Sequence, residues 1–168
     1  MSDDFTYTLN DSGEAVITGY SGDDRELTVP DKVDEYPVTE IGARAFYGRY
    51  KLTAVTLPEG LQSIGDSAFY DCSSLTAVKL PEGLQSIGDS AFSGCSSLTA
   101  VTLPEGLQSI GSDAFYHCSS LTAVTLPNSL KAMGGNPFSY TKTELSLSPD
   151  HPRFALVDGM LIDKGSKR

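Results

Sequence analysis

Residue types that carry chemistry are scarce in this sequence. Its 168 residues include no tryptophan, two histidines (His117 and His151) and three cysteines. Neither histidine lies in a motif that pairs a nucleophile with a base, and a zinc site would need four converging ligands. The sequence therefore predicts a protein that is not an enzyme and that holds no metal and no cofactor.

Long apolar runs are absent as well. No stretch approaches the roughly 18 consecutive apolar residues of a membrane-spanning helix, so we expect no membrane insertion. The first six residues, Met1–Thr6, contain neither a basic residue nor an apolar core, and no secretory signal is recognised there. Two possibilities stay open: the protein is cytoplasmic, or it is a cell-surface or secreted protein with a signal outside this sequence.

Positive charge is rare in the middle of the chain. Between Leu52 and Leu130 the only cation is Lys79. The same stretch holds seven acidic residues: Glu59, Asp66, Asp71, Glu82, Asp89, Glu105 and Asp113. With a formal net charge of −10, such a surface repels phosphate groups. We therefore expect neither nucleic acid nor anionic lipid as a partner.

A motif of 23 residues recurs through most of the chain. A fixed period of roughly 20–50 residues is typical of a solenoid, in which each unit packs only on its neighbours. One unit buries too little apolar surface to offset the entropy of ordering its backbone, so the units must stack. The sequence predicts a single domain of about five units. The residues with this spacing are Phe46, Phe69, Phe92, Phe115 and Phe138; Leu52, Leu75, Leu98 and Leu121; Pro58, Pro81, Pro104 and Pro127.

Each unit divides into three segments. Residues 75–80 alternate apolar and polar side chains, as a half-buried strand does, and the following proline ends the strand. In the second segment Leu84 and Ile87 are expected to point inward. A glycine then recurs at 42, 65, 88, 111 and 134, which indicates positive φ or very close packing.

The third segment is predicted to be one short helical turn. The position before its first alanine is occupied by residues that favour a helix N-cap: Ser67, Ser90, Asp113 and Asn136. Pro137 replaces the alanine in the last unit and is well tolerated at a helix start. Arg44 in the first unit departs from this rule, so we expect a less regular turn there.

The pattern L-x-x-V-x-L-P-x-x-L-x-x-I-G-x-x-A-F-x-x-C resembles the BspA-like leucine-rich repeats, a bacterial class with a 23-residue unit. The resemblance covers about Leu27 to Leu147. It implies a right-handed, curved solenoid, mainly β with short helical turns. It also implies a role in binding, often within cell-surface proteins that attach to matrix or to other cells.

Both ends of the repeat region carry hairpin signals. Alternating residues around Phe5–Leu9 and a turn at Asn10–Gly13 predict an N-terminal cap over residues 1–26. The repeats then run over 27–147. Within the C-terminal segment 148–168, the dipeptide Asp158-Gly159 suits a type I′ hairpin, and 163–168 is expected to fray. A further strand could follow this hairpin, so the chain could be complete or a piece of a longer protein.

The three cysteines occupy one position of the repeat and should stack on consecutive rungs. Rungs about 4.8 Å apart fall within the Cα range of a disulfide, but parallel side chains on adjacent rungs point in unfavourable directions for bonding. We expect Cys72, Cys95 and Cys118 to be free, buried and apolar in character. His117, next to Cys118, is expected to face outward.

Two surfaces are candidates for binding a partner protein. The first is the outer face of the strands, formed by Ala54, Thr56, Ala77, Lys79, Ala100, Thr102, Ala123 and Thr125. The second is a flank with Tyr47, Tyr70 and Tyr116, interrupted by Ser93; these tyrosines could cover the core or contact a partner. The resemblance, together with the absence of catalytic groups, implies a non-catalytic protein-binding or adhesion module of a bacterial surface protein. A small intracellular scaffold or effector is the alternative.

Overall fold

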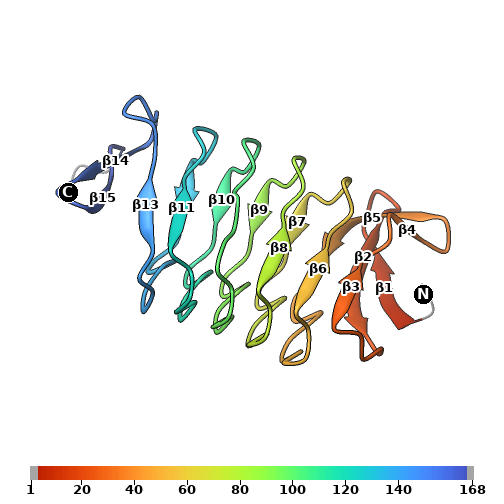
Figure 1. The fold of residues 1–168 in the computed structure, drawn as a ribbon. Helices are drawn as coiled ribbons and strands as arrows, with labels where there is room; N and C mark the ends of the chain where they lie inside the picture. The colour runs from red at the N-terminus through yellow and green to blue at the C-terminus, as the bar shows by residue number, and fades with distance from the viewer. Residues whose placement is uncertain (1–3, 166–168) are drawn as a thin grey trace.

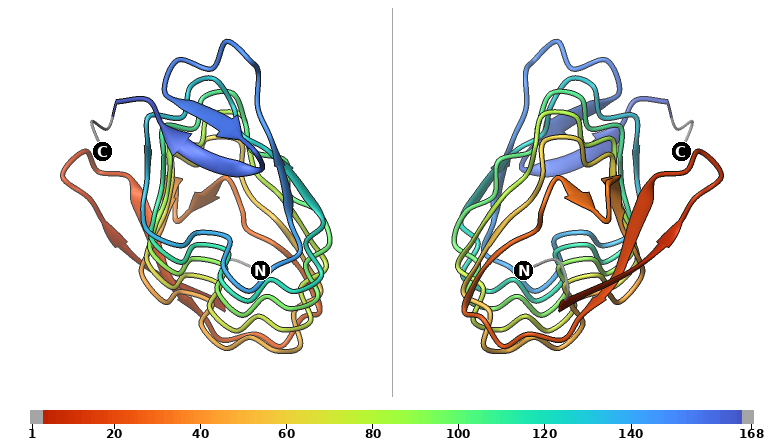
Figure 2. Two further views of the ribbon diagram at one scale, coloured as in Figure 1. Left: turned by 90° about the vertical axis from the view of Figure 1, so that its left-hand side faces the viewer. Right: turned by 90° about the vertical axis from the view of Figure 1, so that its right-hand side faces the viewer.

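The chain forms a β-solenoid. The computed structural model describes residues 4–165; most of its fifteen short strands lie on successive turns of one coil, and the others form hairpins near its ends (Figure 1). The coil advances from the N-terminal hairpin at one end to the C-terminal hairpin at the other. Viewed along the axis, the turns superpose on one another (Figure 2). The predicted solenoid is therefore confirmed.

One side of the coil carries the strands that the repeat motif predicts. Parallel pairing joins β3 (Glu26–Thr28), β6 (Ala54–Thr56) and β8 (Ala77–Lys79), and a bridge continues from Ala77 to Ala100. Further along, β11 (Ala123–Thr125) pairs with β13 (Glu144–Ser146). This side has six rungs, one more than the five predicted units. The additional rung is β13, which follows Phe138 and has no phenylalanine of its own.

A second side of the coil carries shorter strands. They are β5 (Tyr36–Ile41), β7 (Ser63–Ile64), β9 (Ser86–Ile87), β10 (Ser109–Ile110) and β12 (Ala132–Met133), all parallel. Each lies in the segment where Leu84 and its equivalents were expected to turn inward, and Leu84 and Ile87 are indeed buried.

The third side consists of turns, and no helix is found in residues 5–165. The predicted N-caps are wrong. Ser67, Ser90, Asp113 and Asn136 have φ between 55° and 57°, in the left-handed region, whereas an N-cap has extended backbone. Arg44 has φ 60° and adopts the same conformation, so the first turn is not an exception. Hydrogen bonds from residue i to i−3, as from Tyr70 N to Ser67 O, close these turns without continuing into a helix.

The repeated glycine is required for close packing. A Cβ on Gly88 would lie 2.7 Å from the backbone nitrogen of Asp66 on the preceding turn. The same collision with the previous turn occurs at Gly65 and Gly111. Of the two explanations that the sequence left open, close packing is the correct one, and the left-handed φ lies two residues later in the unit.

Aromatic rings fill the centre of the coil. Phe46, Phe69, Phe92 and Phe115 are fully buried, and each ring stacks on the next with centroids 5.1–5.4 Å apart. Phe138 extends the column at 5.4 Å. Repetition at 23 residues places one ring per turn, so a continuous core forms along the axis.

Hairpins cover both ends of this core. At the N-terminus β1 (Phe5–Leu9) pairs antiparallel with β2 (Ala15–Tyr20), which joins the second side through β5. A short strand β4 (Lys32–Val33) pairs with the start of β5. At the C-terminus β14 (Phe154–Val157) pairs with β15 (Met160–Asp163) and crosses the open end of the coil (Figure 2).

The turn chemistry of the C-terminal hairpin follows the sequence. Asp158 and Gly159 have φ of 51° and 77°, both positive, as a type I′ turn requires. The prediction that the chain frays from residue 163 onward is wrong for Asp163 itself. Asp163 lies in β15, and its carboxylate binds Arg153 at 2.7 Å. Residues 166–168 of the predicted frayed tail lie outside the described residues.

Candidate binding surfaces

The strand face presents its side chains in two rows along the coil. Strand register aligns Glu26 with Ala54, Ala77 and Ala100, and Ala123 with Glu144. The shared repeat position joins the two sets in one row, so small apolar side chains are bounded by a carboxylate at each end. The neighbouring row holds threonines and one serine, with Lys79 as its only cation. All eight residues predicted for this face are exposed or half-buried, while Val55, Val78 and Val101 between the rows are buried. The face itself therefore has the predicted composition.

Hydroxyl groups at the margin of the strand face bind the backbone of the preceding turn. Thr76 donates to the Thr53 carbonyl at 3.1 Å, and Thr53 donates to the Arg25 carbonyl at 3.0 Å. Thr125 and Ser146 share a hydrogen bond of 2.8 Å across β11 and β13. These hydroxyls therefore tie one turn to the next. A surface of small side chains suits a broad partner rather than a small molecule.

The tyrosine flank divides into two aromatic groups. Tyr47 and Tyr70 stack with centroids 5.0 Å apart and planes 5° apart. On the other side of Ser93, Tyr116 meets Tyr140 at 5.1 Å, and Tyr140 stacks on His117 at 4.9 Å. Tyr47 and Tyr140 are more than half exposed. The outward orientation predicted for His117 is confirmed, and Tyr140 is a member of this flank that the sequence analysis missed.

The cysteines form the buried ladder that the sequence predicted. Cys72, Cys95 and Cys118 are fully buried and free. Each thiol donates to a carbonyl on the preceding turn, as Cys72 does to Phe46 at 3.2 Å. Burial raises the pKa of Cys72 and of Cys118 to about 12 and raises that of Cys95 as well. Thiols held neutral in this way are poor nucleophiles.

The second histidine has a structural role. His151 is fully buried; its Nδ1 accepts the backbone N–H groups of Arg153 and Phe154, both at 3.1 Å. The protonated Nε2 donates to the Pro127 carbonyl at 2.8 Å. The side chain therefore fastens the start of the C-terminal hairpin to the preceding turn. Residues 4–165 contain no group of three or more His, Cys, Asp or Glu arranged to hold a metal ion.

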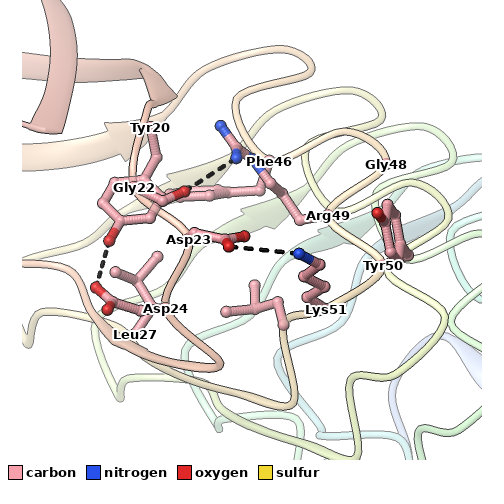
Figure 3. Close-up of a pocket in the computed structure, with 11 residues that line it drawn as sticks. Tyr20, Gly22, Asp23, Asp24, Leu27, Phe46, Gly48, Arg49, Tyr50 and Lys51 are labelled. Carbon is pink, nitrogen blue, oxygen red and sulfur yellow. Dashed lines mark hydrogen bonds and ion pairs between the residues drawn. The ribbon is translucent and has the colours of Figure 1, made fainter.

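A cavity of about 250 Å³ lies where the N-terminal cap meets the first full turn (Figure 3). The loop 20–27 and the turn 46–52 form its walls. Tyr20 donates to the Asp24 carboxylate, and burial followed by this bond raises the pKa of Tyr20 to about 12. Lys51 pairs with Asp23 at 3.4 Å.

Arg49 closes the cavity and occupies the repeat position that cysteine holds in later units. Its guanidinium lies 5.6 Å from the Tyr20 ring centroid and donates to the Gly22 carbonyl at 3.2 Å. The charged groups around the cavity thus already have hydrogen-bond or ion-pair partners within the chain. The volume of the cavity is below the roughly 300–1,000 Å³ of usual ligand sites. We interpret it as the joint between cap and repeats. The replacement of cysteine by arginine was the signal that sequence reasoning passed over.

The repeat motif and the fold together decide the family. The sequence matches the family described as BspA type leucine rich repeat region, in six copies over residues 37–149. The chain belongs to this BspA-type leucine-rich repeat family. The resemblance stated from the motif is confirmed. A search of curated proteins gives no significant match.

Solved structures of bacterial leucine-rich repeat proteins share the fold of this BspA-type chain. A leucine-rich repeat protein of T. pallidum is 38% identical, with 83% of this chain and 65% of that chain covered and a TM-score of 0.81. One from Bacteroides ovatus is 30% identical, with 88% and 40% covered and a TM-score of 0.79. A leucine rich cell surface protein of Faecalibacterium prausnitzii is 29% identical, with 97% and 57% covered and a TM-score of 0.66.

This BspA-type chain therefore spans between 40% and 65% of the length of these three structures. It resembles proteins that include a cell-surface protein. Within residues 4–165, no helix is both long and apolar enough to cross a membrane.

Proposed function

We propose that this protein is a non-catalytic protein-binding module of a bacterial surface-type leucine-rich repeat protein, and that its strand face binds the partner. The partner is a host or bacterial protein of the surface or matrix. The strand face carries the proposal because most of its side chains are small: alanines lie between Glu26 and Glu144 in one row, and threonines and a serine accompany Lys79 in the other. The cell-surface description of the F. prausnitzii relative supports the location.

The acidic ends of the alanine row suggest how a partner would align. Glu26 and Glu144 lie at opposite ends of the row, and Lys79 lies near its centre in the adjacent row. A partner with cationic groups at two ends of an otherwise small, apolar contact would match these charges. Complementary charges of this kind set orientation and association rate more than affinity.

Charge placed at the centre of the face tests the proposal. Ala77→Glu with Ala100→Glu puts two carboxylates on adjacent central rungs, where like charges and desolvation oppose docking. The matched control is Gln85→Glu with Gln108→Glu, which adds the same charge to exposed positions on the second side. Immobilised protein is exposed to extracellular-matrix extract and to source-cell surface extract, and bound proteins are quantified by mass spectrometry.

We expect at least one protein to bind the unmodified chain and the control, and to be lost from the double alanine variant. If that variant retains every protein that the control retains, the strand face is not the binding surface. Changing Tyr70 and Tyr116 to serine in the same assay then separates the tyrosine flank from the strand face.

An intracellular scaffold is the second candidate, and the three free thiols favour it. Reduced cysteines persist most readily in a reducing compartment, although full burial would also protect them elsewhere. Protease treatment of intact source cells distinguishes the two locations. Loss of the protein from intact cells contradicts the scaffold, whereas protection until lysis contradicts the surface module.

A further inference from the structure

A notch interrupts the tyrosine flank at one turn of the coil. The repeat position that holds Tyr47, Tyr70 and Tyr116 holds Ser93 in the turn between Tyr70 and Tyr116. The position one residue later, occupied by Asp71 and His117 in the adjacent turns, is Gly94 at this turn. The small side chain of Ser93 leaves a recess at this turn, while the Asp71 carboxylate occupies the space over Gly94. The recess is lined by Tyr70, Ser93, Gly94 and Tyr116 together with Asp71, Ser73, Ser96 and His117.

The notch is about one aromatic ring wide. Tyr70 and Tyr116 are two turns apart, so with rungs about 4.8 Å apart their positions are separated by about 10 Å. One face of Tyr70 is covered by Tyr47, stacked at 5.0 Å, and the other borders the notch. A ring between Tyr70 and Tyr116 would repeat on both sides the spacing that Tyr47 and Tyr70 already show. The repeat itself thus specifies what fits there, because a tyrosine fills this position in the turn on each side.

The rim of the notch offers an acceptor for a hydroxyl group. Asp71 extends its carboxylate over Gly94, where any side chain would collide with it. Tyrosine hydroxyls donate to aspartate carboxylates at two other places in this chain, from Tyr7 to Asp34 at 2.7 Å and from Tyr20 to Asp24. The combination of a tyrosine ring on each side and one carboxylate therefore matches a phenol better than a plain apolar group.

We propose that this notch binds a tyrosine side chain of the partner protein, with its ring between Tyr70 and Tyr116 and its hydroxyl donating to Asp71. Deeply inserted aromatic side chains are the contacts that carry most of the energy in protein interfaces. This inference rests on the proposed function in taking the partner to be a protein. It adds a specific anchor on a different surface from the strand face.

The test uses a probe that requires no partner. N-acetyl-L-tyrosinamide is titrated into the isotope-labelled chain, and the amide signals of Ser93, Gly94 and Ser96 are followed by NMR. We expect saturable shifts at these amides, and weaker binding of N-acetyl-L-phenylalaninamide, which lacks the hydroxyl. N-acetyl-L-leucinamide at the same concentration should cause no saturable shift. Asp71→Asn should reduce the preference for tyrosine over phenylalanine.

The decisive variant is Ser93→Tyr, which fills the notch with the residue found in the turns on each side. This variant should lower the affinity for N-acetyl-L-tyrosinamide by about tenfold or more. It should not unfold the chain, since the same side chain is accommodated at Tyr70 and Tyr116. Ser139→Tyr is the matched control, because it adds a tyrosine at the same repeat position two turns away. The control should bind the probe as the unmodified chain does.

Three results would overturn the proposal: no saturable shift up to the solubility of the probe, undiminished binding in Ser93→Tyr, or tighter binding of methyl β-D-glucopyranoside than of the tyrosine probe. The last result would assign the notch to sugars. None of these results bears on the strand face, which is tested separately with the double alanine variant.

Discussion

Phe92 is a suitable residue for measuring how much the stacked phenylalanine rings contribute to the stability of the coil. Its ring is fully buried and lies between Phe69 at 5.2 Å and Phe115 at 5.4 Å, with planes within 3° of each other. Truncation would remove contacts with two turns at once. The backbone around it is fixed by hydrogen bonds to the next turn, such as Phe92 N to Ala114 O at 2.8 Å, so the space cannot easily collapse.

We therefore expect Phe92→Ala to lower the free energy of unfolding by about 3–5 kcal/mol. Urea denaturation followed by circular dichroism measures the change. Thr102→Ala, on the exposed strand face, serves as the control and should stay within about 0.5 kcal/mol. A loss below about 1 kcal/mol for Phe92→Ala would show that the phenylalanine column is not the core of the fold.

The cysteine ladder gives a prediction about pH. Burial raises the pKa of Cys72 to about 12, whereas a thiol in the unfolded chain ionises near about 8.5. The folded state therefore keeps its protons more tightly than the unfolded state between these two values. This contribution to stability is complete below about pH 8.5 and is lost as the pH rises toward 12.

Two measurements follow from these thiols. The free energy of unfolding should fall as the pH is raised above about 8.5, and Ellman's reagent at pH 8 should label the cysteines only after denaturant is added. Cys118, whose pKa is likewise raised to about 12 by burial, should behave as Cys72 does. Rapid labelling of the folded chain would contradict the burial of the ladder.

At the scale of the single turn, the glycine that follows the second strand decides whether two turns can approach. Gly88 and Gly83 belong to the same unit, yet only Gly88 is in tight contact with the preceding turn. A Cβ on Gly88 would lie 2.7 Å from Asp66 N, but one on Gly83 would lie 3.5 Å from its nearest atom, Glu59 O. The first distance is a collision with backbone and the second an ordinary contact.

Gly88→Ala should accordingly destabilise the protein by about 1–3 kcal/mol, as overpacking does. Gly83→Ala is the matched control: it has the same side-chain change in the same unit and should alter stability little. Thermal unfolding of the two variants under identical conditions compares them. Equal effects of the two changes would mean that close approach between turns is not what requires glycine here.

The strands and the core could be predicted from the sequence because apolar residues recur at fixed positions of the repeat. Val78 and Ile87 recur with the repeat and are buried as expected. The left-handed turn could not be predicted in the same way. Serine, aspartate and asparagine suit both an N-cap and a turn, and only the packing of one turn on the next selects positive φ at Ser67 and its equivalents.

The candidate sites, too, could be predicted only in part from the sequence. The sequence identified Tyr70, Tyr116 and the interruption at Ser93, because all three occupy one repeat position. It did not reveal the notch, since the recess and the Asp71 carboxylate over Gly94 depend on how neighbouring turns pack. The cavity behind Arg49 depends on how the N-terminal cap meets the first turn, and no repeated residue reports that contact.

For the whole molecule, stability is distributed along one dimension. Each turn contacts only the turns beside it, so the ends of the coil can open without the centre. His151 is the fastening at the C-terminal end: two backbone N–H groups bind its Nδ1, and its Nε2 reaches the Pro127 carbonyl of the preceding turn. Phe154 of β14, 5.5 Å away by ring centroids, completes the cover of the core.

His151→Ala should therefore loosen one end of the molecule. Losing three hydrogen bonds of about 0.5–1.5 kcal/mol each should lower the local free energy of opening by about 2–4 kcal/mol. Amide hydrogen exchange should accelerate in β13 and β14 and stay unchanged in β8 and β9, because the lost contacts do not extend beyond the last turns. Asp150→Ala, an exposed neighbour, is the control and should leave exchange at both places unaltered. Acceleration throughout the coil would instead mean that the solenoid opens as one cooperative unit, and that its end is no weaker than its centre.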